Sequence, residues 1–216
     1  MRIGVLGTGM VGRALATRLV GLGHDVKMGS RSAASEPAQD WLRAQTGTAS
    51  AGTFAEAAAH GEAVFLAVRG DIALDVLDLA GAAPLADKIL VDVSNPLDFS
   101  RGMPPVLIEG LSNTTSLGEE VQSKLPDTRV VKTLNTMNAD VMVHPDRVPG
   151  RSDVFICGED AAAKAAVVQL LNEFGWTGPI DLGGISAARG TEAMLPVWLR
   201  LWQALGTADF NFRIVR

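Results

Sequence analysis

The sequence predicts a doubly wound α/β fold, with a mainly parallel central sheet and a small helical element at the C-terminal end. Short β-rich runs alternate with helical patterns along the chain, which is typical of this architecture. The runs are apolar without regular polar interruption, as in strands that are buried on both faces. The third observation is a glycine-rich turn between the first run and the first helical pattern.

The lengths of these segments define the individual elements. Strands are predicted at residues 2–6, 25–28, 63–68, 88–93, 129–134 and 153–157, with brief further strands near 48–50 and at 178–182. Helices are predicted at residues 10–21, 37–45, 53–60, 71–79, 116–125, 160–174 and 187–205. Two of these helices have strong start signals, because Thr53 precedes Glu56 and Ser116 precedes Glu119 in capping-box spacing.

The composition is that of an ordinary globular protein and excludes several classes of function. With 47% hydrophobic residues, 20% charged residues and a net charge of -5, the chain is neither disordered nor basic enough to bind nucleic acid. The single cysteine, Cys157, excludes an internal disulfide, and no apolar run approaches the ~20 residues that cross a bilayer. We therefore expect a cytoplasmic protein with no nucleic-acid partner, no membrane partner and no metal site.

The glycine-rich turn has the spacing of a dinucleotide-binding loop. Gly7, Gly9 and Gly12 form G-x-G-x-x-G directly after the first predicted strand. Gly7 allows the tight turn, Gly9 lets the backbone approach a pyrophosphate, and Gly12 lets the helix pack closely on the strand. The free N–H groups at the start of the helix then favour a phosphate. A glycine-rich turn without a ligand is the alternative, and the position between strand and helix argues against it.

The end of the second predicted strand indicates which dinucleotide binds. NAD-binding folds place an acidic side chain there, on the adenosine ribose, and that acid would repel a 2′-phosphate. This chain instead has Ser30 and Arg31, which offer a hydroxyl and a planar fork of N–H groups. Asp25 begins the strand and is badly placed to substitute for the missing acid. The pair predicts NADP(H), the alternative being a solvated turn.

Three further strand ends contribute to the predicted site, because ligands of open α/β sheets bind outside the carboxyl ends of the strands. The apolar runs end at Val68, at Ser94 and Asn95, and at Asn135. Ser and Asn are also favoured in ordinary turns, which is the alternative interpretation of these residues.

Five segments of the chain resemble one known family. They are MRIGVLGTGMVGRALATRLVGLGHDVKMGSR, VDVSNPLD, VVKTLNTMNADVM, VFICGED and ARGTEAMLPVWLRLW. Together they are similar to the NADPH-dependent F-420 reductase family, also called F-420-dependent NADP oxidoreductases, over essentially the whole length. The resemblance implies a Rossmann-type NADP-binding domain at 1–183. The remaining segment, 184–216, is expected to be a C-terminal helix and tail, which would form a cleft wall by the resemblance and a dimer contact through its apolar side chains.

The resemblance also implies roles for individual residues. In the family, the glycine loop holds the pyrophosphate and a Ser-Arg pair holds the 2′-phosphate, and these roles fall on Thr8, Gly9, Met10, Val11, Ser30 and Arg31. Reduced nicotinamide passes a hydride to a deazaflavin ring stacked against it. The residues expected near the two rings are Val68, Asn95, Asn135, Thr136 and Ala139.

The turn at 135–139 leaves the acceptor open. Archaeal members of the family have a His-Thr-Ile-Pro-Ala stretch where this chain has Asn135 to Ala139. The Asn-Thr form also resembles the reductase domain of membrane metalloreductases, which pass a hydride from NADPH to a flavin. The expected partner is a small-molecule redox acceptor, first the deazaflavin coenzyme F-420. A flavin, a ferric chelate and a small imine or carbonyl compound are the alternatives.

Direct hydride transfer requires alignment of two rings and exclusion of water, so the sequence identifies no catalytic residue. The second function class is that of β-hydroxyacid and imine dehydrogenases, which need a general acid or base, often a Lys in K-x-x-N spacing on a helix. Lys132 and Asn135 have this spacing on a strand pattern, where they would point to opposite faces. His144 is interpreted as a loop histidine, with a proton donor as the alternative. A non-catalytic NADP-sensing protein is the third class.

The last predicted helix bears on assembly. Its apolar side chains spread round most of its circumference; they are Met194, Leu195, Val197, Trp198, Leu199, Leu201, Trp202 and Leu205. A helix that is apolar on nearly all sides must be covered on nearly all sides. We therefore predict a homodimer in which the second subunit covers part of this helix, with burial inside one monomer as the alternative.

Overall fold

The apolar runs of the sequence form an eight-stranded sheet in the computed structural model, which describes residues 1–215. The strands of this sheet are β1 (Arg2–Leu6), β2 (Asp25–Ser30), β3 (Ala49–Thr53), β4 (Ala63–Leu66), β5 (Ile89–Asp92), β8 (Arg129–Thr133), β9 (Phe155–Cys157) and β10 (Ile180–Asp181). Their order across the sheet is β10-β9-β8-β5-β4-β1-β2-β3, and only the β8–β9 pair is antiparallel. The six strands from β3 to β8 have the order of a Rossmann sheet. The predicted fold class is confirmed.

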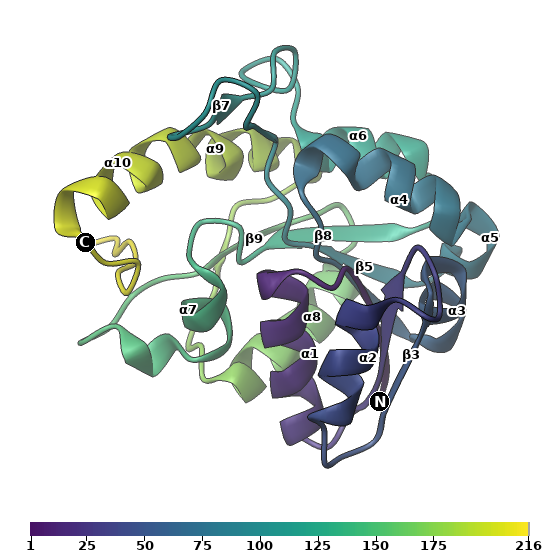
Figure 1. Cartoon of the computed structure of the whole chain (residues 1–216). Helices are drawn as coiled ribbons and strands as arrows, with labels where there is room; N and C mark the ends of the chain where they lie inside the picture. Colours follow the sequence, from purple (N-terminus) through teal and green to yellow (C-terminus); the bar gives the residue numbers. More distant parts are fainter. Residues whose placement is uncertain (216) are drawn as a thin grey trace.

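Helices cover both faces of this sheet, as Figure 1 shows. One face carries α1 (Met10–Gly21), α2 (Glu36–Arg43), α7 (Ala139–Val143) and α8 (Ala161–Phe174). The other carries α3 (Phe54–His60), α4 (Ala73–Ala80), α5 (Ala82–Leu85) and α6 (Leu117–Lys124). Each layer buries its own hydrophobic core against the sheet, so the strands are apolar on both sides.

The predicted helix starts at Thr53 and Ser116 are confirmed. The Thr53 hydroxyl accepts a hydrogen bond from the Glu56 backbone N–H, and the Glu56 carboxylate accepts one from the Thr53 backbone N–H. The Ser116 hydroxyl caps α6 by accepting from the Glu119 N–H. Each cap supplies a partner to N–H groups that the first turn of a helix leaves free.

The last helix differs from its prediction, because it is broken into α9 (Ala188–Ala193) and α10 (Leu195–Leu205). The break lies at Met194, two residues before Pro196. Proline has no N–H to donate to the carbonyl four residues earlier, so a straight helix through this position would lose a hydrogen bond. The sequence prediction also left out the short β6 (Leu97–Asp98) and β7 (Val106–Leu107), which form a separate two-stranded sheet, and the short helices α5 and α7.

Three properties of the described residues bear on the expected classes of function. Within residues 1–215, no helix is both long enough and apolar enough to cross a bilayer. No group of three or more His, Cys, Asp or Glu side chains in the same range could hold a metal ion. Cys157 is fully buried in β9, and burial raises the pKa of its thiol to about 12, so it is a protonated thiol at neutral pH.

Candidate functional site

The carboxyl ends of five parallel strands lie side by side. The strand register places Gly29 beside Leu6, Leu6 beside Leu66, Leu66 beside Asp92, and Asp92 beside Lys132. Because the strands run in the same direction, the residues that follow each of these positions emerge at one edge of the sheet. This edge therefore brings together the glycine loop, the Ser30–Arg31 pair and the predicted strand-end residues.

Two glycines of the loop are required by close backbone contacts. Gly7 has φ 129°, a conformation that side chains rarely adopt, and it donates its N–H to Gly29 O at 3.0 Å. A Cβ atom at Gly12 would lie 2.1 Å from the carbonyl oxygen of Gly7. Any larger residue at Gly12 would therefore push the start of α1 away from the loop.

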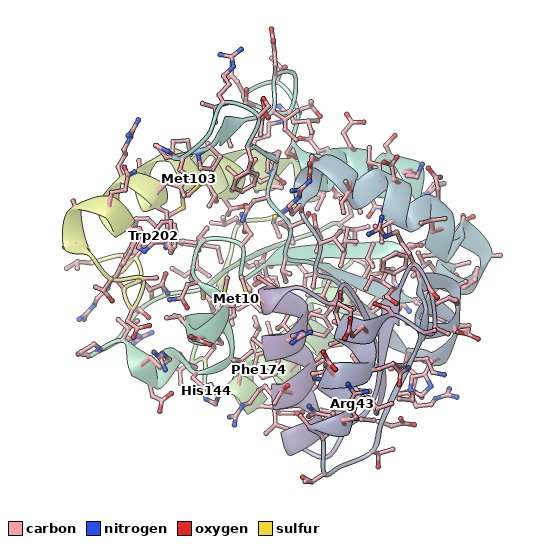
Figure 2. All side chains as sticks on the ribbon, in the orientation of Figure 1. Met10, Arg43, Met103, His144, Phe174 and Trp202 are labelled. Atoms are coloured by element: carbon pink, nitrogen blue, oxygen red, sulfur yellow. The ribbon has the colours of Figure 1, made fainter. Side chains whose placement is uncertain are left out.

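Gly9 has the opposite surroundings, because a Cβ there would meet no atom within 4 Å. It is the N-cap of α1, and the first turn of this helix contains no acidic residue. The loop is thus open on the side where the first N–H groups of α1 are free, which suits an anion. Met10, the first residue of α1, is 77% exposed beside this opening (Figure 2).

The sequence analysis missed Arg13, whose hydrogen bonds fix the glycine loop. Arg13 Nε donates to Thr8 O at 3.0 Å, and Arg13 Nη2 donates to Pro37 O at 2.9 Å. One guanidinium therefore ties the glycine loop to the start of α2. An arginine on the outside of a helix carries no sequence signal for such a role.

Ser30 and Arg31 differ sharply in how free their side chains are. Ser30 is 5% exposed, and its hydroxyl donates to Ser32 O at 2.6 Å. Arg31 is exposed, and no hydrogen bond or ion pair with another described residue engages its guanidinium. The structure thus leaves Arg31 available to an anion, while Ser30 must turn its hydroxyl to donate to one.

The ends of β4, β5 and β8 are joined by direct contacts. Asn95 Nδ2 donates to Asn135 O at 2.8 Å, and Asn135 Nδ2 donates to Asn95 Oδ1 at 2.9 Å. A Cβ at Gly70 would lie 2.1 Å from Asn95 O, so the turn after β4 packs directly on the turn after β5. Val68 is partly exposed between this turn and Gly7. Asn95, Asn135 and Val68 are therefore brought together.

The turn after β8 is held in an unusual conformation. Leu134 has φ 62°, which is rare for a residue with a side chain and is often found at functional sites. Its neighbours are fixed on both sides, since Thr133 Oγ1 donates to Phe155 O at 2.7 Å and Asn135 is paired with Asn95. Thr136 and Ala139 are 2% and 4% exposed, so their side chains face the protein interior.

The chain after α10 returns to the same turn. Asn138 caps α7 and also donates to Ala208 O at 2.6 Å. Arg147 Nη2 bonds Asp209 Oδ2 at 2.8 Å, which fixes the returning segment a second time. Phe210 then stacks on Trp198, with ring centroids 5.2 Å apart. The C-terminal region thus presents aromatic rings next to the turn that follows β8.

Lys132 does not belong to an acid–base pair with Asn135. Its side chain is fully buried, and Nζ lies 2.8 Å from both Asp92 Oδ2 and Glu192 Oε1. Burial alone would lower the pKa of this ammonium, but the two carboxylates outweigh it and hold the pKa above its ordinary value of 10.5. Lys132 and Asn135 thus make separate contacts, as the strand pattern predicted, and Lys132 stays a protonated ammonium at neutral pH, so it is not available as a general base.

Comparison with known proteins assigns the family. Residues 2–96 match the family model described as NADP oxidoreductase, coenzyme F-420-dependent. A solved structure from Arthrobacter sp. FB24, described as a candidate F-420-dependent NADP reductase, is 51% identical, covers 100% of both chains and superposes with a TM-score of 0.94. The chain belongs to the F-420-dependent NADP oxidoreductase family. The resemblance inferred from the sequence is therefore confirmed, and so is its class, that of NADP-dependent oxidoreductases.

This F-420-dependent NADP oxidoreductase family member is also similar to curated relatives of two kinds. Metalloreductase STEAP3 of Rattus norvegicus is 36% identical over 91% of this chain, but only 38% of that protein is covered. The chain thus spans about two fifths of the length of the curated metalloreductases that it matches. F420-dependent NADP reductase of Methanothermobacter marburgensis is 29% identical over 93% of this chain and 92% of its own.

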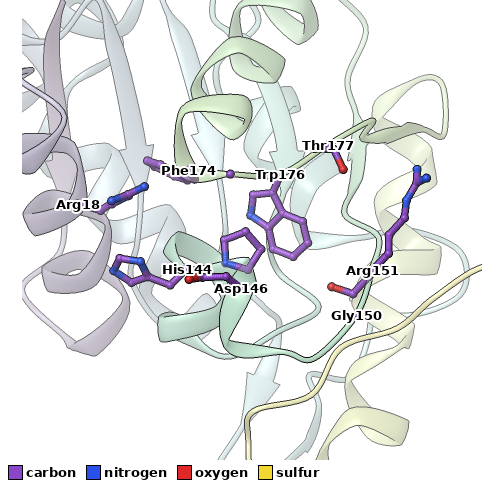
Figure 3. Close-up of a pocket in the computed structure, with 11 residues that line it drawn as sticks. Arg18, His144, Asp146, Gly150, Arg151, Phe174, Trp176 and Thr177 are labelled. Atoms are coloured by element: carbon purple, nitrogen blue, oxygen red, sulfur yellow. The ribbon is translucent and has the colours of Figure 1, made fainter.

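Two hollows of this family member lie beside α1. One, of about 550 Å³, runs along α1 and α7 from Met10 to His144. The other, of about 670 Å³, has Arg18 and His144 at one end and Arg151 at the other, with Trp176 between them (Figure 3). Arg18 is eight residues after Met10, which is about 12 Å along the helix axis. His144 therefore lies beside Arg18, toward the end of α1 opposite the glycine loop (Figure 2).

Proposed function

We propose that this protein transfers a hydride between NADP(H) and a flat, flavin-like acceptor, with the deazaflavin F-420 as that acceptor. The observation that carries the proposal is the row of strand ends. An open glycine loop, a free guanidinium and a pair of bonded amides lie there at one edge of the sheet.

The nucleotide would lie across this row. We place the pyrophosphate on the loop formed by Gly7, Thr8, Gly9, Met10, Val11 and Gly12. The 2′-phosphate then reaches Arg31, whose guanidinium is exposed and unengaged by other described residues. The nicotinamide would lie over Val68 and the Asn95–Asn135 pair, with Thr136 and Ala139 shaping the turn below it.

The side chains near the proposed nicotinamide position favour a flat ring as the hydride acceptor over a substrate that needs proton transfer. The amides of Asn95 and Asn135 bond each other and do not ionise, and the ammonium of Lys132 is held by buried carboxylates. Such a site offers alignment and exclusion of water, which is what hydride transfer between stacked rings requires. Phe210, which is partly exposed and stacks on the buried Trp198, is suited to contact an aromatic ring.

The test is a turnover assay with NADPH and oxidised F-420, followed by the visible absorbance of the deazaflavin. We expect the absorbance to fall as NADPH is consumed. Constant absorbance, in a sample that still oxidises NADPH with another acceptor, would refute the deazaflavin assignment while leaving the oxidoreductase class in place.

A second acceptor class has its own support, because the 36% identical relative is named a metalloreductase. FMN, FAD and ferric chelates therefore belong in the same panel, together with a small imine and a small carbonyl compound. If the protein binds NADPH but oxidises it with none of these compounds, a non-catalytic NADP-sensing protein becomes the better proposal.

The surface of α10 supports the proposed homodimer. Val197 and Leu205 are 55% and 56% exposed, and Trp202 is 38% exposed, whereas Leu195, Trp198 and Leu199 are buried within the chain. An exposed face with these side chains is typical of a subunit contact. Sedimentation at micromolar concentration should give the mass of two chains, and a monomeric mass would contradict the proposal. The division at residue 183 and the cytoplasmic location remain predictions.

A further inference from the structure

A buried cluster of three charged side chains, Asp92, Lys132 and Glu192, joins the C-terminal region to the edge of the sheet. We infer that Lys132 is a positioning residue, which fixes the turns after β5 and β8 and docks α9 beside them. Through these contacts it would set the alignment of the two reacting rings. The inference rests on the proposed hydride transfer and extends it to residues that touch neither ring.

The ammonium of Lys132 is fully used within the protein. An ammonium has three N–H groups, and three acceptors surround this one. They are Asp92 Oδ2 at 2.8 Å, Glu192 Oε1 at 2.8 Å and the Ser94 carbonyl oxygen at 2.7 Å. Asp92, Lys132 and Glu192 are each at most 1% exposed. Lys132 therefore has no donor left for a ligand and acts only through its neighbours.

One group of contacts leads from Lys132 to the amide pair. Asp92 Oδ1 accepts hydrogen bonds from the Ser94 backbone N–H at 2.9 Å and from Ser94 Oγ at 2.6 Å. Ser94 is thus held at its N–H, its hydroxyl and its carbonyl. The next residue is Asn95, which is bonded to Asn135. Lys132 is itself three residues before Asn135 on β8, so the same ammonium anchors both strand ends that carry the amide pair.

A second group of contacts leads from Lys132 to the C-terminal region. Glu192 lies on α9, and its carboxylate accepts from the Leu117 N–H at 2.8 Å and from the Gly118 N–H at 3.0 Å. These are free N–H groups of the first turn of α6. A Cβ at Gly118 would lie 2.9 Å from the Cβ of Ala188, so only a glycine lets α9 approach this closely. Glu192 thus links α9, α6 and β8 at a single carboxylate.

Stability alone is a poor explanation for such a cluster. The cost of removing charges from water often equals or exceeds their attraction, and well-packed apolar residues can replace buried ion pairs without loss of stability. Buried charges instead demand one arrangement, because a shifted partner leaves a charge without a hydrogen bond. Here that arrangement fixes the Ser94–Asn95 turn relative to Asn135 and α9.

The test compares two variants with a matched control. Lys132→Met keeps an unbranched side chain of similar length, one atom shorter, and removes the charge. Glu192→Gln keeps the Lys132–Asp92 pair but places an amide where a carboxylate accepts two N–H groups. Lys88→Met is the control, because Lys88 bonds only the Ala58 and Ala59 carbonyl oxygens, near the opposite ends of the strands.

For the first two variants we expect kcat with the best acceptor to fall by roughly 10- to 100-fold, as a small misalignment of reacting groups does. The Kd for NADPH should stay within about twofold, since the phosphate-binding residues do not contact the cluster. The pH profile of kcat should keep its shape, because Lys132 exchanges no proton. The control should keep the kcat of the unmutated protein. An unchanged kcat in both variants, or the loss of one limb of the pH profile, would overturn the inference.

Hydrogen exchange gives a readout that does not depend on turnover. We expect faster exchange at the backbone amides of Ser94, Leu117 and Gly118 and in the turn at 134–139, with unchanged exchange at 7–12. Unchanged exchange at all these amides would also overturn the inference, whatever the acceptor is. If no acceptor oxidises NADPH in the unmutated protein, the proposed function fails, and hydrogen exchange still decides whether the cluster fixes these turns. Should Lys132→Met fail to fold, Glu192→Gln carries the test.

Discussion

Replacing Arg31 with alanine tests the nucleotide assignment most directly. The guanidinium is exposed and unengaged by other described residues, so its removal breaks no contact of the free protein. The whole effect should therefore appear in the binding of the 2′-phosphate. NADPH carries this group and NADH does not, so the ratio of the two affinities isolates the contribution of Arg31.

The expected magnitude follows from the kind of contact. A hydrogen bond to a charged group contributes about 1.5–3 kcal/mol, which corresponds to roughly 10- to 150-fold in Kd. Because Arg31 is exposed and solvent screens its charge, we expect the lower end of this range at physiological salt. Ser30→Ala should cost less, about 2- to 12-fold, since a neutral hydrogen bond contributes about 0.5–1.5 kcal/mol. The Ser30 hydroxyl must also give up its bond to Ser32 O.

Titration of intrinsic tryptophan fluorescence with NADPH and with NADH measures both constants. Arg43→Ala is the matched control, because Arg43 is an exposed arginine of α2 that pairs with Asp40. It should leave both affinities unchanged. Equal affinities of the unmutated protein for the two nucleotides would refute the reasoning, and so would an equal loss of both in Arg31→Ala.

Four further outcomes are expected. Gly12→Ala places a Cβ 2.1 Å from a backbone oxygen, so it should lower the free energy of unfolding, measured in urea, by about 1–3 kcal/mol or more. It should also weaken the binding of NADPH, measured by a fluorescence titration. The hydrogen bond from Arg189 holds the pKa of Glu119 below its ordinary value of 4.5, so this pair stabilises the fold above that pH and the stability is lost as pH falls through the lowered pKa. In urea unfolding, Glu119→Gln should therefore lose stability at pH 7 and approach the unmutated protein in acid, and parallel pH curves would contradict this. Cys157 should not react with a thiol reagent at pH 8 until the protein is unfolded, because its pKa is about 12; fast labelling of the folded protein would show that β9 opens. His144→Ala should keep turnover and its pH profile, instead of the roughly 10²-fold loss expected for a general acid.

The glycine turn and the strand-end pair of the candidate site could be located from the sequence because their signals are local. G-x-G-x-x-G spacing encodes backbone contacts within a single turn, and the structure shows those contacts at Gly7 and Gly12. Ser30 and Arg31 stand next to each other at a strand end. The sequence did not show that the Ser30 hydroxyl donates to Ser32 O, because a sequence pattern does not determine the rotamer of a side chain.

The rest of the candidate site depends on contacts between distant residues. Glu192 lies 60 residues after Lys132, and nothing near either of them indicates that they meet. The pair of Asn95 with Asn135 and the conformation of Leu134 depend in the same way on how β5 and β8 lie together. The prediction of one continuous helix at 187–205 did not consider Pro196, and the structure has two helices there.

The break at Met194 is a suitable position for joining the C-terminal segment of a relative to this chain. Glu192, which precedes the break, is fixed to α6 and β8. The segment after α10 instead bonds Asn138, Arg147 and Asp153, and α10 itself packs through Leu195, Trp198 and Leu199. Exchanging residues 195–215 between relatives would therefore leave the polar contacts of the charge cluster and of the glycine loop unchanged. Under the proposed function, a change of acceptor among such chimeras would be assigned to residues 195–215, because the glycine loop and the Ser30–Arg31 pair stay constant.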